Sequence, residues 1–253
     1  MRLINMVAQS DNLEKPVTSA TPRRIFFKVA LLASALVFCF ALADILWQYR
    51  WYFPADFQNA GFLRGRQSFF HGAYRIAFYG HIVCGPMVML VALFLLWSGR
   101  RGMTSGLHRR LGKIQFLAVV VVLGPTGLWM ATRAYTGIVA GVGFGILSLL
   151  TMAATVKAVL HIRKQQIALH QLWASRLVVL LLSPIALRII TRVGVAIGFD
   201  ARGAYQFSAW ASWLAPLIAF ELWVRYKSLR ESNNATVHPL DKPISQQKVE
   251  SAL

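Results

Sequence analysis

Three histidines and three arginines in this sequence are of the types that hold a haem inside a helical bundle. His108, His161 and His170 each lie where a basic segment meets a long apolar run. Imidazole is a common axial ligand of haem iron, and guanidinium groups bind carboxylates such as haem propionates through paired hydrogen bonds. The sequence therefore suggests haem b as a candidate cofactor, with His108 and His170 as iron ligands and His161 as an alternative. The predicted propionate-binding residues are Arg109, Arg110 and Arg176.

A second group of ionisable residues falls at similar depth within three apolar runs. Asp44, His81 and Arg188 are predicted to lie about 6–9 Å below the opposite boundary of the membrane, from the helical rise per residue. Arg192 follows Arg188 by one helical turn. An unpaired charge at that depth is costly, so an Asp44–Arg188 ion pair is expected. We interpret these four residues as an outer polar site, for which a purely structural role is equally compatible with the sequence.

Other chemistry has little support, and the sequence leaves open whether the protein is an enzyme. Nucleophile elbows, His-Glu-x-x-His pairs, phosphate-binding loops and dinucleotide fingerprints do not occur. Cys39 and Cys84 lie singly inside apolar runs and form no metal-binding pair. A metal site built from the three histidines and Glu221 would lie among cations, which oppose a divalent ion. No metal is therefore predicted, apart from iron in a bound haem.

Six long apolar segments must position these residues. The chain of 253 residues is 57% hydrophobic and only 14% charged, against about 25% charged residues in soluble domains. A membrane-spanning helix needs about 20 apolar residues, and these runs are continuous rather than alternating, which excludes barrel strands. We predict an all-α polytopic membrane bundle of about six helices, within a domain covering residues 23–230. The predicted spans are 25–47, 76–97, 114–132, 138–160, 172–199 and 205–224.

The distribution of positive charge predicts the orientation of the spans. Fifteen Lys and Arg residues flank the spans on one side and six on the other, so the first side, with both termini, is predicted to be cytoplasmic. The net charge of +18 does not indicate a nucleic-acid partner, because the cations form short clusters between apolar runs. The expected location is the bacterial inner membrane, with lipid as the surrounding partner. The polar ends, residues 1–22 and 231–253, are predicted to be disordered tails.

Several sequence patterns resemble an uncharacterised bacterial membrane family, the domain of unknown function 2306. The likeness covers roughly Tyr74 to Val193 and implies a helical membrane domain with no assigned activity. The sequence departs from the family pattern at Ala174, where methionine is usual, and at Lys113 and Gln115. The matching motifs are His81-Ile82-x-x-Gly85, His108-Arg109-x-Leu111-Gly112, His170-x-x-Trp173-x-x-Arg176 and Leu187-Arg188.

The overall plan is also similar to six-span cytochromes of the b561 type, which carry histidine ligands on four central helices. His108 and His170 begin spans that run in the same direction, whereas His81 and His161 lie at opposite faces and cannot hold a second haem. The sequence therefore favours a haem-b-binding, electron-transferring role. Two alternatives stay open. One is transport of a small solute or proton between the two polar sites, and the other is a non-enzymatic scaffold that binds anionic lipid through its basic loops.

Overall fold

The computed structural model describes residues 22–103 and 105–237. They divide into two compact units after Trp47. The first unit contains α1 (Pro22–Gln48), which ends one residue past the division. The second unit holds the remaining helices and the long segment that precedes them. The predicted tails lie outside the described residues, except at the ends of α1 and of the last helix.

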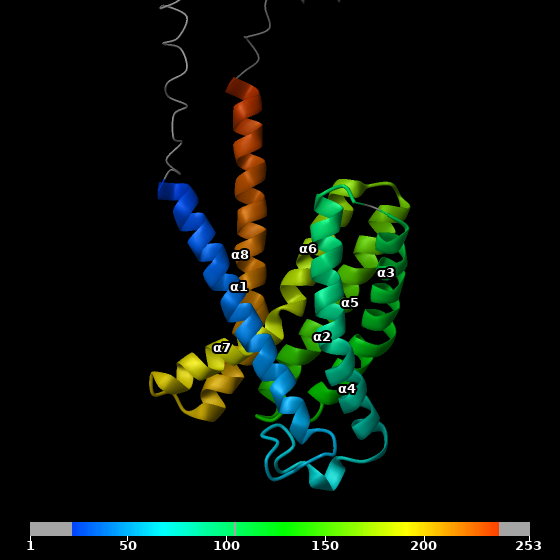
Figure 1. The fold of residues 1–253 in the computed structure, drawn as a ribbon, viewed down its shortest axis with the longest axis vertical. Helices are drawn as coiled ribbons and strands as arrows, with labels where there is room; N and C mark the ends of the chain where they lie inside the picture. The colour runs from blue at the N-terminus through cyan, green and yellow to red at the C-terminus, as the bar shows by residue number, and fades with distance from the viewer. Residues whose placement is uncertain (1–21, 104, 238–253) are drawn as a thin grey trace, which may run out of the picture. The chain divides into compact units, whose positions relative to one another are not determined.

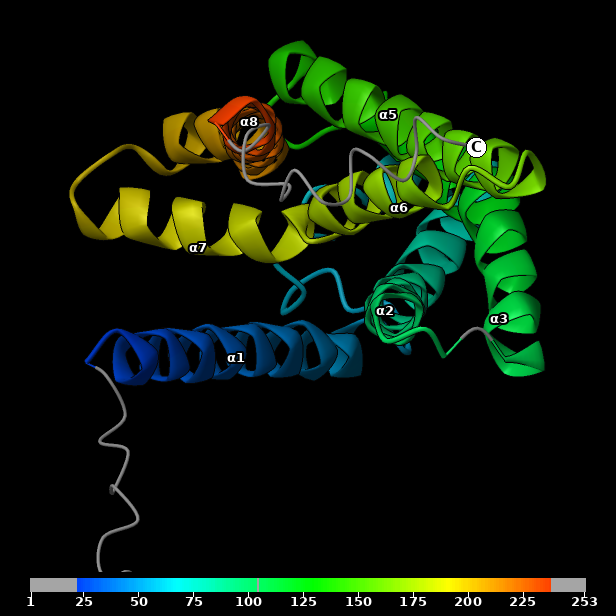
Figure 2. The same ribbon diagram turned by 90° about the horizontal axis from the view of Figure 1, so that it is seen from above.

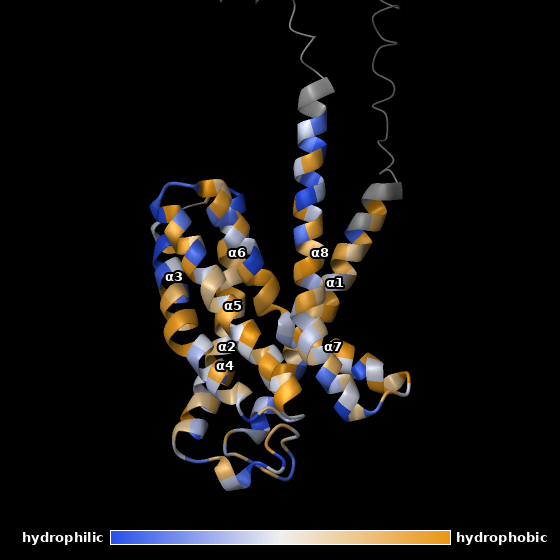
Figure 3. Ribbon diagram, turned by 180° about the vertical axis from the view of Figure 1, so that it is seen from behind, coloured by the Kyte–Doolittle hydropathy of each residue, from blue (hydrophilic) through white to orange (hydrophobic). Residues whose placement is uncertain are grey.

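The predicted all-α membrane architecture is confirmed. Over the described residues, six helical segments are long and apolar enough to cross a membrane. Large apolar side chains are exposed along them, such as Ile76 at 73% and Ile138 at 81%, as expected of surfaces that meet lipid. Figure 3 shows hydrophilic residues gathered at the helix ends of the second unit. The segments are Lys28–Trp51, Gly72–Arg100, Gly106–Ala131, Ile138–Arg163, Ile167–Ala196 and Ala201–Asn233.

Several helices begin earlier than the apolar runs predicted. The third segment begins at Gly106 rather than at residue 114, and the fifth begins at Ile167 rather than at residue 172. Helices continue through the headgroup region, where polar and cationic side chains are well accommodated. His108 and His170 therefore lie in the first turns of their helices, where backbone geometry holds them in place.

Four helical segments of the second unit pack around a common interior. They are α2 (Gly72–Arg100), the third segment, α5 (Ile138–Arg163) and α6 (Ile167–Leu181). Within this group each segment packs against two others, and α6 closes the arrangement by packing on α2 (Figures 1 and 2). The third segment and α6 are consequently diagonal partners, separated by α2 on one side and α5 on the other.

The third segment changes helical type along its length. It comprises α3 (Gly106–Leu117), the π-helix η3 (Ala118–Leu123) and α4 (Gly124–Ala131). Pro125 has no backbone N–H, so the regular hydrogen-bond ladder is interrupted where α4 begins. A Cβ atom on Gly124 would lie 2.3 Å from the Met152 sulfur, which shows how closely α5 approaches at this point.

A proline also divides the fifth segment, whereas another proline leaves its helix continuous. After α6 ends at Leu181, α7 (Ser183–Ala196) begins, with Pro184 in its first turn. α7 turns away from the direction of α6 (Figure 1). The predicted single span 172–199 is therefore divided between two helices. α6 alone is only about 22 Å long, which is shorter than the hydrocarbon core of a bilayer. Pro86, by contrast, lies inside an unbroken α2.

The last helix, α8 (Ala201–Val237), begins against α7 and continues far beyond the predicted span. The hydroxyl oxygens of Thr191 and Ser208 lie 2.6 Å apart where the two helices pack. With 37 residues, α8 is about 55 Å long, more than the bilayer with its headgroups. Its final turns, residues 231–237, are helical and fall within the stretch that the sequence assigns to the C-terminal tail. Helix-surface charges such as the Lys227–Glu231 pair, 3.7 Å apart, suit a segment exposed to water.

The segment between residues 49 and 71 forms a packed cap at the first turns of α2. It contains two short helices, η1 (Tyr49–Trp51) and η2 (Gln67–Phe69). Tyr52, 8% exposed, contacts Phe78 of α2 edge to face, with ring centroids 5.3 Å apart. Burial raises the pKa of the Tyr52 hydroxyl, although Arg188 and Arg66 lie close enough to lower it. The aromatic residues of this segment thus build an internal cluster.

Candidate functional site

His108 is held by a hydrogen bond to the last turns of α2. Its Nδ1 atom lies 2.9 Å from the hydroxyl oxygen of Ser98, which is only 2% exposed. The Ser98 hydroxyl donates its own proton to the Leu95 carbonyl, 3.2 Å away. A hydroxyl carries one proton, so Ser98 accepts from His108, and we infer that the Nδ1 atom of His108 is protonated. The Nε2 atom then carries the lone pair that can bind a metal.

His170 is oriented in the same way by α5. Its Nδ1 atom lies 2.8 Å from the backbone carbonyl oxygen of Ala158. A carbonyl oxygen can only accept, so the Nδ1 atom of His170 must donate, and its Nε2 atom carries the lone pair. An Nδ1–H bond to a backbone carbonyl commonly fixes the ring of a metal-binding histidine.

The structure brings these two histidines to the same end of the four-helix arrangement. Both side chains are half-buried. They come from α3 and α6, the diagonal partners of the bundle. The predicted pair is thus two imidazoles from opposing helices, each with one nitrogen engaged by the protein and the other able to act as a ligand.

The third predicted ligand, His161, is held within a turn. Its Nδ1 atom lies 2.6 Å from the amide oxygen of Gln166, in the connection between α5 and α6. Within the described residues, no group of three or more His, Cys, Asp or Glu side chains is placed to share a metal ion. His161 and Glu221 therefore do not join His108 and His170 in one metal-binding group.

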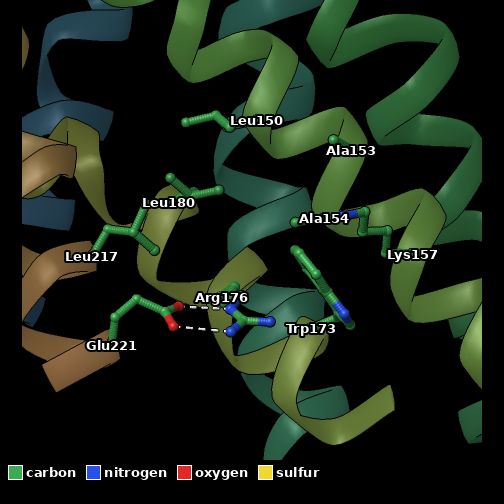
Figure 4. Close-up of a pocket in the computed structure, with 9 residues that line it drawn as sticks. All are labelled: Leu150, Ala153, Ala154, Lys157, Trp173, Arg176, Leu180, Leu217 and Glu221. Atoms are coloured by element: carbon green, nitrogen blue, oxygen red, sulfur yellow. Dashed lines mark hydrogen bonds and ion pairs between the residues drawn. The ribbon is translucent and has the colours of Figure 1, made fainter. Parts of the chain in front are cut away.

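The three predicted propionate-binding arginines separate in the structure. Arg109 and Arg110 are exposed near His108 in the first turns of α3. Arg176 points instead toward α8, where its Nε and Nη2 atoms donate to the two carboxylate oxygens of Glu221 at 2.6 and 2.9 Å (Figure 4). This bidentate bond joins α6 to α8.

Sequence reasoning missed two residues beside this ion pair. The Trp173 ring lies between two cations, with Lys157 Nζ 4.3 Å and Arg176 Cζ 4.2 Å from its centroid. In the sequence, Lys157 is one of the fifteen cations that flank the spans, and Trp173 is part of a family motif. Their meeting depends on the packing of α5 on α6, which residue spacing within one helix cannot predict.

Within the second unit, His81 and Arg188 of the predicted outer polar site contact different groups. The Nδ1 atom of His81 lies 3.3 Å from the Thr126 hydroxyl, against Gly127, where an added Cβ would lie 3.2 Å from the ring. Arg188 instead donates to the Pro184 carbonyl at 3.0 Å and interacts electrostatically with Tyr52 of the cap. Arg192 is exposed one turn further along α7.

Asp44 belongs to the first unit and Arg188 to the second, so their ion pair stays a prediction. A double-mutant cycle with Asp44→Asn and Arg188→Gln would test it. Effects on thermal stability that simply add would contradict the pair, because groups in direct contact show a coupling energy.

Comparison with known proteins identifies a family whose description names no activity. The model of the family described as predicted membrane protein (DUF2306) matches residues 78–224, which is more than half of the chain. The match extends beyond the likeness seen in the motifs and includes most of the apolar part of α8. No curated protein and no solved structure matches the chain.

Proposed function

This chain belongs to the family of predicted membrane proteins DUF2306, and we propose that it binds a haem b between His108 and His170. The proposed role is electron transfer, because a haem with two axial histidines exchanges single electrons. What supports the proposal is one observation: two half-buried imidazoles lie at the same end of diagonal helices, each with its Nδ1 atom held by the protein. Each Nε2 atom could then act as a ligand of the haem iron.

The contacts of the three predicted arginines indicate which of them could hold the haem propionates. Arg176 is bonded to Glu221, so this role falls to Arg109 and Arg110, which carry exposed cations beside His108. Propionates at this position would lie near the end of the bundle, where water and cations stabilise them. Ser98 would act as a positioning residue, because its hydroxyl fixes the tautomer and direction of the His108 ring.

The test is a visible absorption spectrum of the full chain, produced with ample haem supply and purified in mild detergent. We expect a Soret band, and sharp α and β bands after reduction with dithionite. His108→Ala and His170→Ala should each abolish the low-spin spectrum. Added imidazole should restore it in His108→Gly, since that variant opens space for a free ligand.

Two further variants make the result specific. His71→Ala is the matched control, because His71 precedes the first turn of α2, whereas His108 contacts Ser98 near the last turn of α2. The spectrum of this variant should equal that of the wild type. Ser98→Ala should keep the haem but change its reduction potential, which a purely structural role would not do. A colourless wild-type protein, or a low-spin spectrum retained by both ligand variants, would overturn the proposal and leave transport or lipid binding as the better hypotheses.

A further inference from the structure

A cavity of about 300 Å³ lies between α5, α6 and α8 (Figure 4). Its volume is at the lower end of the range for small-molecule pockets. A cavity of this size holds a head group and the beginning of a chain, but not an entire two-chain lipid.

One end of the cavity is lined by charged and aromatic side chains. Lys157 and Arg176 lie on opposite sides of the Trp173 ring, and Arg176 is bonded through two nitrogens to Glu221. Two cations and one carboxylate give this end a net charge of +1. The bidentate pair neutralises Arg176, so Lys157 supplies the excess positive charge.

The other end of the cavity is apolar. Leu150, Leu180 and Leu217 each come from a different helix, and Ala153 leaves space beside them (Figure 4). The cavity therefore has a cationic end and a hydrocarbon end, which is the polarity of an amphiphile with a negative head group.

The depth of the two ends matches a lipid in the surrounding leaflet. Lys157 lies six residues before the end of α5, and Trp173 six residues after the start of α6, so both are about 9 Å from the helix ends. Leu150 lies about 20 Å from the same end of α5. The headgroup layer is about 5–7 Å thick on each side, so the cationic end lies just inside the hydrocarbon boundary and the leucines lie alongside acyl chains.

We propose that this cavity binds an anionic phospholipid of the leaflet that surrounds the histidine-bearing end. The phosphodiester lies against Lys157 and the edge of Trp173, and one acyl chain enters between Leu150, Leu180 and Leu217. A singly charged head group matches the net charge of the cavity, and basic pockets between membrane helices are known to hold anionic lipid head groups. The proposal does not depend on haem binding.

The competing explanation is that Arg176 and Glu221 only fasten α6 to α8. A fastening role accounts for the ion pair, whose side chains are 18% and 34% exposed. It gives no function to Lys157 or to the space beside Ala153. Variants at these two positions, which leave the ion pair intact, therefore separate the two explanations.

The experiment titrates the detergent-purified full chain with dioleoylphosphatidylglycerol and counts bound lipid by native mass spectrometry. Lys157→Gln should raise the dissociation constant about fivefold, the expected effect of one cation near an anionic head group. Ala153→Phe should weaken binding at least as much, because the new ring fills the cavity without changing its charge. Dioleoylphosphatidylcholine, with a neutral head group, should bind less tightly than the anionic lipid.

Matched controls exclude general effects of charge and bulk. Lys164→Gln removes a cation from the exposed turn after α5, and Leu149→Phe adds a ring on a lipid-facing part of α5. Neither should change binding of the anionic lipid. The proposal would be overturned if Lys164→Gln weakened binding as much as Lys157→Gln, or Leu149→Phe as much as Ala153→Phe. Equal binding of phosphatidylglycerol and phosphatidylcholine would also overturn it. If the protein bound oleate in a Lys157-dependent way but did not bind phosphatidylglycerol, the ligand would be a fatty acid, and the phospholipid proposal would be wrong.

Discussion

At the scale of single residues, Arg66 shows how a buried charge can hold a connecting segment in place. Its side chain is 4% exposed and donates to the Phe62 carbonyl at 2.6 Å, the Arg133 carbonyl at 2.7 Å and the Tyr74 hydroxyl at 2.9 Å. Its guanidinium also lies 4.2 Å from the Phe62 ring centroid. The cap thus joins α2 to the connection between α4 and α5 through one side chain.

Replacing Arg66 should destabilise the protein strongly. Arg66→Met leaves two partly buried carbonyl oxygens and the Tyr74 hydroxyl without their donor, and we expect a loss of about 3 kcal/mol in the free energy of unfolding. Thermal unfolding in detergent would measure this loss as a lower Tm. Arg64→Met is the control, because Arg64 is exposed in the same segment, and its effect should stay within about 0.5 kcal/mol. Equal effects of the two substitutions would contradict the role assigned to Arg66.

At the scale of elements, the glycines at the start of α5 serve different purposes. Gly137, Gly141 and Gly145 form a repeat typical of close helix packing. Only Gly141 meets another backbone, since an added Cβ would lie 2.6 Å from the Ala131 carbonyl oxygen. Gly137 precedes α5 with a φ of +88°, which few other residues adopt, and Gly145 has no atom within 4 Å of its added Cβ.

Alanine substitutions in this repeat should therefore change stability in opposite directions. Gly141→Ala forces α5 away from the end of α4, and we expect a destabilisation of about 1–3 kcal/mol. Gly145→Ala meets no obstacle and should stabilise the helix by up to about 1 kcal/mol, because alanine restricts the unfolded chain more than glycine does. The Tm values of the two variants in the same detergent would test this, and a similar decrease in both would refute the packing role.

At the scale of the whole molecule, the asymmetry of positive charge predicts that both termini are cytoplasmic. Cysteine labelling in whole bacterial cells would check this orientation, using a background in which Cys39 and Cys84 are replaced by alanine. Ser68→Cys lies in the exposed part of the cap and should react with a membrane-impermeant maleimide in intact cells. Ser251→Cys, near the end of the chain, should react only after permeabilisation. The reverse pattern would invert the predicted topology.

The sequence by itself determined the features that arise from composition along one stretch of chain. Six apolar runs of spanning length suffice to predict six helical segments, because the bilayer forces such runs into helices. The relation of His108 to His170 was also predictable, since two spans running in the same direction place their first turns at the same face. Family membership was visible in the ordered histidine motifs.

Only the tertiary structure decided which side chains meet across helices. The aromatic residues after Trp47 are typical of a membrane interface, yet Tyr52 packs inside the cap because α2 presents Phe78 to it. Arg176 binds Glu221 instead of the histidine end, and Lys157 meets Trp173, because of the rotation of α5, α6 and α8 about their axes. Hydropathy reports the depth of a residue but not the direction in which its side chain points, so these contacts depend on packing between helices.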